Sequence, residues 1–102
     1  MGVPLSETLA SAELLGLKTA LNEFVAYGAL ANLEPDVLSE RSKLITLYAL
    51  CGFANFSSVG ILVSGISAMA PERKNDLIKV SLKALVGATL ASCMTGLVIG
   101  IF

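Results

Sequence analysis

The chain has 102 residues, of which 55% are hydrophobic and only 15% charged, and its net charge is −1. Soluble domains usually carry about 25% charged residues, and the mean hydropathy here is +0.80. The composition therefore indicates a membrane protein, with a soluble helical bundle as the alternative. The seven basic side chains form no dense stripe and histidine is absent, which excludes a nucleic-acid-binding surface and argues against an enzyme.

The first segment, residues 1–33, predicts two short helices in place of one crossing of the membrane. Ser6 is a plausible N-cap for a helix over 6–15, which covers roughly 15 Å, about half of the apolar core of a bilayer. We expect Gly16 to end this helix and a second one to run over 18–32. Non-helical backbone at membrane depth survives only beside protein or a polar cavity. The pattern is therefore typical of a re-entrant helical hairpin.

A polar link over 34–43, whose last residues cap the next helix, precedes an apolar segment over 44–70. The charge-free part of that segment would be roughly 40 Å long if fully helical, which exceeds the apolar core. Gly52, Asn55 and Gly60 lie near its centre. We interpret the segment as a discontinuous transmembrane helix whose unwound centre can meet a substrate. A continuous, tilted helix is the alternative.

The last part consists of a charged turn with an amphipathic start, over 71–83, and a terminal transmembrane helix over 84–102. The turn carries four basic residues, against two in the link before the apolar segment. The positive-inside rule therefore places the turn in the cytoplasm and opens the hairpin toward the outer face. Pairs of small residues four apart predict helix-packing surfaces on the terminal helix. These pairs are Gly87 with Ala91 and Gly96 with Gly100.

Glu23 is the leading candidate for a binding residue, since it lies in a region otherwise apolar enough for a bilayer. A charge at membrane depth costs about 2.5–3.5 kcal/mol even on lenient scales, so it must face protein or a polar substrate. An ionised carboxylate accepts several hydrogen bonds and suits a ligand with vicinal hydroxyls. The alternative is an ion pair with Lys18. On one helix the two residues would lie about 140° apart, so they would not share a face.

Four further polar or aromatic residues are candidates. Asn22 shares a helix face with Lys18, and either could support the hairpin tip or contact the substrate. Asn55 and Ser58 are three apart, and their groups match a nucleobase edge or a sugar hydroxyl. Phe53 offers a flat apolar surface to a ring. Without further information, an amide and a hydroxyl in a membrane helix are interhelical contacts worth about 0.6 kcal/mol.

Two motifs carry a resemblance to a known family. Residues 16–27 read Gly-x-Lys-x-x-x-Asn-Glu-Phe-Val-Ala-Tyr, and residues 52–58 read Gly-Phe-Ala-Asn-Phe-Ser-Ser. Both resemble the substrate-contacting segments of the concentrative nucleoside transporters, in the same order. The likeness extends through the charged turn to the final helix. Members of the family are several times longer, so the chain resembles their C-terminal portion.

The resemblance implies a cation-coupled nucleoside symporter that works by alternating access. Glu23 would bind the ribose hydroxyls, and Phe53, Asn55 and Ser58 would contact the nucleoside. The coupling cation would be sodium or a proton, with its ligands outside this chain and no cofactor. The partners would be the lipid bilayer, the remainder of the transporter and, at full length, two further copies in a homotrimer, in a bacterial inner membrane. The alternative is a structural or regulatory membrane fragment, because half a site cannot enforce alternating access.

Overall fold

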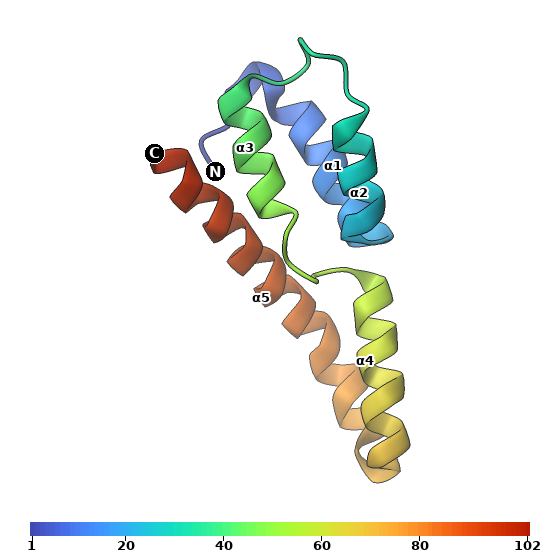
Figure 1. Ribbon diagram of the computed structural model, residues 1–102. Helices are drawn as coiled ribbons and strands as arrows, with labels where there is room; N and C mark the ends of the chain where they lie inside the picture. Colours follow the sequence, from blue (N-terminus) through green and yellow to red (C-terminus); the bar gives the residue numbers. More distant parts are fainter.

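The computed structural model describes residues 1–102 and is entirely helical (Figure 1). Its elements in chain order are η1 (Leu5–Glu7), α1 (Thr8–Ala20), α2 (Glu23–Ala31), α3 (Glu40–Ala49), α4 (Phe56–Met69), η2 (Pro71–Arg73) and α5 (Lys74–Ile101). The molecule is elongated, with extents of 51 × 25 × 18 Å. The helix α5 runs along its length, α3 packs beside the C-terminal half of α5, and α4 packs beside the N-terminal half.

The hairpin is formed by α1 and α2, and the chain turns between them at Leu21 and Asn22. The predicted break at Gly16 was wrong, because α1 continues through that residue to Ala20. One glycine in a helix costs only about 1 kcal/mol relative to alanine, whereas Asn22 supplies a complete N-cap. Its backbone is extended, with φ −164° and ψ 169°, and its side-chain oxygen accepts the N–H of Val25 at 2.9 Å. The expected N-cap at Ser6 was also wrong, since that residue lies within η1.

The apolar segment after the link is interrupted, so the alternative of one continuous helix was wrong. The first half, α3, begins at Ser39, whose hydroxyl accepts the N–H of Ser42 at 3.2 Å. The second half, α4, begins at Asn55, whose side-chain oxygen accepts the N–H of Ser58 at 2.7 Å. Residues 50–55 between the two helices carry no regular helix. A capped start for each half explains why the interruption is stable.

The terminal helix α5 is longer than expected, since it begins at Lys74 and includes the charged amphipathic start. The stretch Pro71–Ile101 is long and apolar enough to cross a membrane. Its small residues Gly96 and Gly100 form a packing surface, as predicted, and they pack against Met1 and α3. A Cβ atom at Gly96 would lie 3.0 Å from the carbonyl oxygen of Ile45. At Gly87 nothing lies within 4 Å, so the predicted packing surface there is not used within this chain.

The core lies between the hairpin and α3, where Leu14, Ala26, Leu38 and Leu50 are buried together. In contrast, α4 has no buried residue. Many of the large apolar side chains of α4 and α5 are exposed. Apolar surface on this scale requires a bilayer or further protein.

At the outer end of the hairpin, Glu7 connects η1 to the start of α3. Its carboxylate accepts the backbone N–H of Ser39 at 3.0 Å and the hydroxyls of Ser39 and Ser42. The hydrogen bond from Ser42, against a smaller opposing effect of burial, holds the pKa of Glu7 below its ordinary value. A negative charge at this position also suits the N-terminal end of the α3 dipole.

Candidate functional site

The candidate site lies where the starts of α2 and α4 meet, below the tip of the hairpin (Figure 1). The amide of Asn55 joins the two helices. Its oxygen caps α4 through Ser58, and its nitrogen donates a hydrogen bond to Glu23 Oε2 at 2.7 Å. The Asn55 side chain is 0% exposed. This buried amide uses both its acceptor and a donor, so its orientation is fixed.

All five candidate residues from the sequence line one open groove of about 680 Å³. The complete lining is Asn22, Glu23, Phe53, Asn55, Ser57, Ser58, Ile61 and Leu62. Small-molecule sites commonly occupy about 300–1,000 Å³, with a few polar groups among apolar ones. Ile61 and Leu62 were missed, although they lie three and four residues after Ser58 on α4. Helical spacing from Ser58 would have found them.

The charge of Glu23 is stabilised by its position. It is the first residue of α2, and Asn55, the N-cap of α4, donates to it. Helix N-terminal ends carry partial positive charge, which favours a carboxylate. Its second oxygen makes no hydrogen bond within the chain. Glu23 therefore retains acceptor capacity toward the groove.

The alternative role for Glu23, an ion pair with Lys18, is not formed. The two residues lie on different helices, so the angle predicted for a single helix does not apply. The Lys18 ammonium donates instead to the carbonyl oxygen of Ala49 at 3.3 Å. Asn22 caps α2, which confirms the supporting role expected for it at the hairpin tip, and it also lines the groove.

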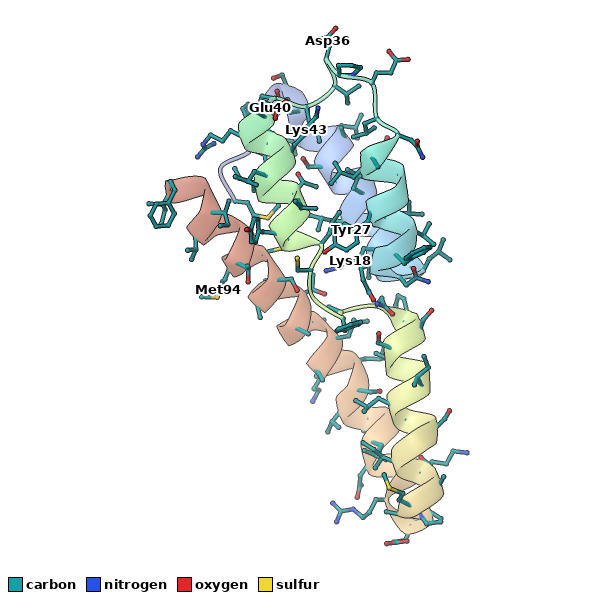
Figure 2. All side chains as sticks on the ribbon, viewed as in Figure 1. Lys18, Tyr27, Asp36, Glu40, Lys43 and Met94 are labelled. Atoms are coloured by element: carbon teal, nitrogen blue, oxygen red, sulfur yellow. The ribbon has the colours of Figure 1, made fainter.

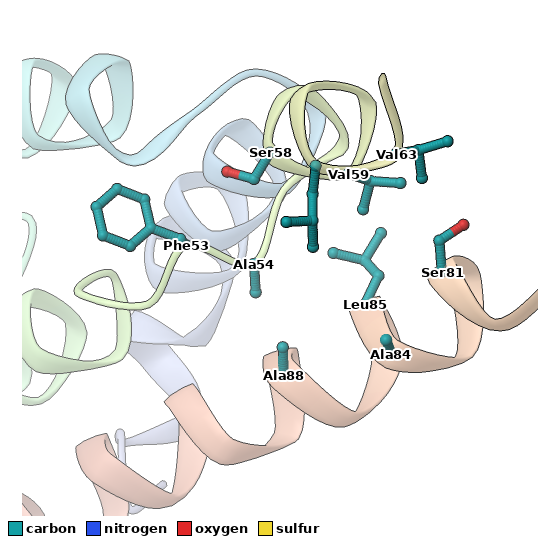
Figure 3. A pocket seen from close by; sticks show the side chains of 10 residues that line it. Phe53, Ala54, Ser58, Val59, Val63, Ser81, Ala84, Leu85 and Ala88 are labelled. Atoms are coloured by element: carbon teal, nitrogen blue, oxygen red, sulfur yellow. The ribbon is translucent and has the colours of Figure 1, made fainter. Parts of the chain in front are cut away.

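Phe53 lies in the non-helical segment between α3 and α4, and its side chain is 77% exposed. It borders the groove and a second, apolar pocket of about 140 Å³ between α4 and α5. Figure 3 shows Phe53 and Ser58 on one side of this pocket, with Leu85 and Ala88 of α5 on the other. Phe53, Ser58 and Leu62 thus line both the groove and the apolar pocket.

The non-helical segment rests directly on α5 at Gly52. A Cβ atom there would lie 2.0 Å from Ser92 Oγ. A larger residue there would require either the Ser92 hydroxyl or the segment to move. The contribution of Ser92 was not predicted, because nothing local in the sequence relates it to residue 52.

The groove combines a carboxylate, two amides, hydroxyls and an aromatic ring, and no group of His, Cys, Asp and Glu side chains gathers to hold a metal ion. Carboxylate and amide oxygens accept from hydroxyl groups, and the aromatic ring offers a stacking face. The arrangement suits an uncharged, polyhydroxylated ligand with a flat ring.

Residues 1–100 match the family described as "Na+ dependent nucleoside transporter C-terminus". An uncharacterized transporter of Haemophilus influenzae is 44% identical over 101 residues, covering 95% of this chain and 24% of the relative. Nucleoside permease NupC of Helicobacter pylori is 40% identical over 106 residues, covering 100% of this chain and 25% of the relative. Human solute carrier family 28 member 3 is 40% identical over 115 residues, covering 99% of this chain and 17% of the relative.

Solved structures agree with the fold. CNTnw in an inward-facing substrate-bound state has a TM-score of 0.87 and 42% identity, covering 97% of this chain and 25% of that chain. A doubly substituted CNTnw in an outward-facing state has a TM-score of 0.86 and 41% identity, covering 97% of this chain and 24% of that chain. The chain therefore spans between about a sixth and a quarter of the length of the proteins that it matches.

Proposed function

The chain belongs to the sodium-dependent, or concentrative, nucleoside transporter family, whose C-terminal portion it matches, and we propose that it supplies half of the substrate site of a cation-coupled nucleoside symporter. The observation that carries the proposal is the Glu23 carboxylate, held by Asn55 where two capped helices begin. Glu23 accepts hydrogen bonds from the ribose hydroxyls. Asn55 and Ser58 contact the nucleoside, Phe53 lies against its ring system, and Asn22 supports the tip.

The placement in the membrane follows from helix length. At 1.5 Å per residue, α1 and α2 span about 20 Å and 14 Å, which is too short for the apolar core of about 30 Å. They form a re-entrant hairpin within 1–33, whereas α3, which already begins in the polar link at Glu40, and α4 form the two halves of the discontinuous transmembrane helix expected over 44–70. The exposed apolar faces of α4 and α5 meet lipid and the remainder of the transporter. The turn within 71–83 lies in the cytoplasm, and the protein is multi-pass in a plasma membrane, the inner membrane of a bacterium.

Transport proceeds by alternating access, coupled to the entry of sodium or a proton whose ligands lie outside this chain. The similar TM-scores to inward-facing and outward-facing CNTnw support a segment that keeps its internal arrangement between such states. The site would then be carried between the two faces as a unit. At full length we infer a homotrimer.

The test replaces Glu23 by Gln in the full-length parent and measures the initial rate of nucleoside uptake. We expect uptake to fall at least about tenfold, since a hydrogen bond to a charged group contributes roughly 1.5–3 kcal/mol. Glu13→Gln is the matched control, because Glu13 is an exposed carboxylate on the same hairpin. Uptake by Glu23→Gln equal to that of the control would reject the assignment.

The second candidate is a structural or regulatory membrane segment without transport of its own, because half a site cannot enforce alternating access. Reconstitution of the isolated chain into lipid vesicles distinguishes the two. Nucleoside accumulation driven by a cation gradient would exclude the fragment role. Its absence, combined with loss of uptake in full-length Glu23→Gln, fits a half-site that needs the rest of the transporter.

A further inference from the structure

Lys18 is a fully buried cation directly above the site. Its side chain is 0% exposed, and its one hydrogen bond runs from Nζ to the carbonyl oxygen of Ala49 at 3.3 Å. Figure 2 shows Lys18 near Tyr27, at the junction of the hairpin with the end of α3. A buried charge is costly unless it is compensated. Its position therefore requires an explanation.

The end of α3 supplies the compensation. Ala49 is the last residue of α3, and the last carbonyl groups of a helix lack partners within it. They also carry the negative end of the helix dipole, which favours a cation. The ammonium of Lys18 satisfies one such carbonyl where the chain leaves the helix to enter the non-helical segment.

The same bond connects the two elements that carry the site. Lys18 lies five residues before Glu23, and Ala49 lies six residues before Asn55. Two other bonds join the hairpin to the interrupted helix, Ser11 to Thr46 at 2.9 Å and Tyr27 to Cys51 at 3.0 Å, but the Lys18 bond and the Glu23–Asn55 bond, at 2.7 Å, are the ones that involve a charged group. Lys18 does not line the groove, so an effect on a bound substrate would pass through these residues.

We propose that Lys18 is a positioning residue for sugar recognition, which rests on the function proposed above. It holds the hairpin against the end of α3 in the register that lets Asn55 orient the Glu23 carboxylate toward the sugar hydroxyls. Hydrogen bonds weaken steeply with distance and angle, and a displacement of about 1 Å is enough to lose most of their contribution. Loss of Lys18 therefore removes discrimination in favour of the sugar hydroxyls.

The experiment measures uptake of a ribonucleoside and of its analogue without the 2′ and 3′ hydroxyls, in the full-length parent. Lys18→Met keeps the approximate length of the side chain but removes its charge and its hydrogen-bond donors. Lys18→Arg keeps the charge and the donors. Lys79→Met is the control, because Lys79 is an exposed lysine of α5 without an ion pair. The readout is the ratio of kcat/KM for the two nucleosides, which does not depend on the amount of folded protein.

We expect Lys18→Met to lower this ratio about tenfold, the factor typical of one hydrogen bond to a charged group, with Lys18→Arg restoring part of it. A proportional loss for both nucleosides would overturn the proposal and leave Lys18 a purely structural role. If Lys18→Met does not reach the membrane, Lys18→Gln is measured instead: a lowered ratio supports the proposal and an unchanged one overturns it. Failure of the proposed function is a separate result, an unchanged ratio in Glu23→Gln.

Discussion

Asn55 allows a stringent test of the site, because one side chain performs two separable tasks. Its oxygen caps α4 and its nitrogen donates to Glu23, both at 2.7 Å. Asn55→Ser keeps an oxygen able to cap the helix but removes the amide N–H group that reaches Glu23, because the shorter serine side chain ends at its hydroxyl. It should cost roughly 1.5–3 kcal/mol, the contribution of a hydrogen bond to a charged acceptor. Asn55→Ala loses the cap as well, which adds about 1 kcal/mol.

Asn22 provides the matched control. It caps α2 in the same way, and its amide nitrogen makes no hydrogen bond within the chain. Serine is an equally good N-cap, so Asn22→Ser should change stability by a few tenths of a kcal/mol. Asn55→Asp completes the series. It retains the cap but places a carboxylate against Glu23, where repulsion between charges about 3 Å apart costs several kcal/mol.

The assay is thermal unfolding of the detergent-purified full-length parent, with and without nucleoside. We expect the Tm to decrease in the order wild type, Asn22→Ser, Asn55→Ser, and to be lowest for Asn55→Ala and Asn55→Asp. The nucleoside-induced rise in Tm should shrink in all three Asn55 variants. Equal effects of serine at positions 22 and 55 would refute the reasoning, because they would show that the bond to Glu23 contributes nothing.

Two further predictions concern the surroundings of the site. Gly52→Ala should destabilise the same protein by about 1–3 kcal/mol, because the added Cβ atom overpacks against Ser92. Gly60→Ala is the control: its Cβ atom meets nothing within 4 Å, so it should stabilise α4 by about 0.5–1 kcal/mol. Equal melting temperatures of the two variants in thermal unfolding would contradict this prediction. Because the pKa of Glu7 is lowered in the folded state, chiefly by Ser42, its stabilising effect is present above the ordinary value of 4.5 and is lost as pH falls through the lowered one. Wild type should therefore melt above Glu7→Gln at neutral pH and converge with it in acid, and parallel curves of Tm against pH would exclude this role.

The chemistry of the site could be predicted from the sequence because polar groups in an apolar chain are costly and therefore informative. Glu23 was recognisable on that ground, whereas Asn55 and Ser58 were singled out as substrate contacts only by the resemblance of their motif; the structure brings all three together in one groove with Asn22 and Phe53. The interruption of the second helix was predictable for a related reason. A segment of roughly 40 Å is too long for the bilayer and contains an amide and two glycines near its centre.

Contacts between distant residues could not be predicted in this way. The approach of Gly52 to Ser92 and the bond from Lys18 to Ala49 depend on where α5 and the hairpin pack. No local pattern encodes a separation of 31 or more residues. A mid-chain lysine is equally compatible with solvent, an ion pair or the end of another helix, and only the fold selects the last of these.

The misplaced hairpin break shows why such details matter for function. With a break at Gly16, Glu23 would lie in the interior of a helix, away from the partial positive charge of a helix start. The N-cap at Asn22 instead makes Glu23 the first residue of α2, adjacent to Asn55 at the start of α4. The glycine was the more conspicuous signal for a break, but glycine only tolerates a turn, whereas the asparagine side chain stabilises one. Asn22, by capping α2, therefore also determines where the Glu23 carboxylate lies. The placement of the candidate site thus depends on the same hydrogen bond that starts the helix.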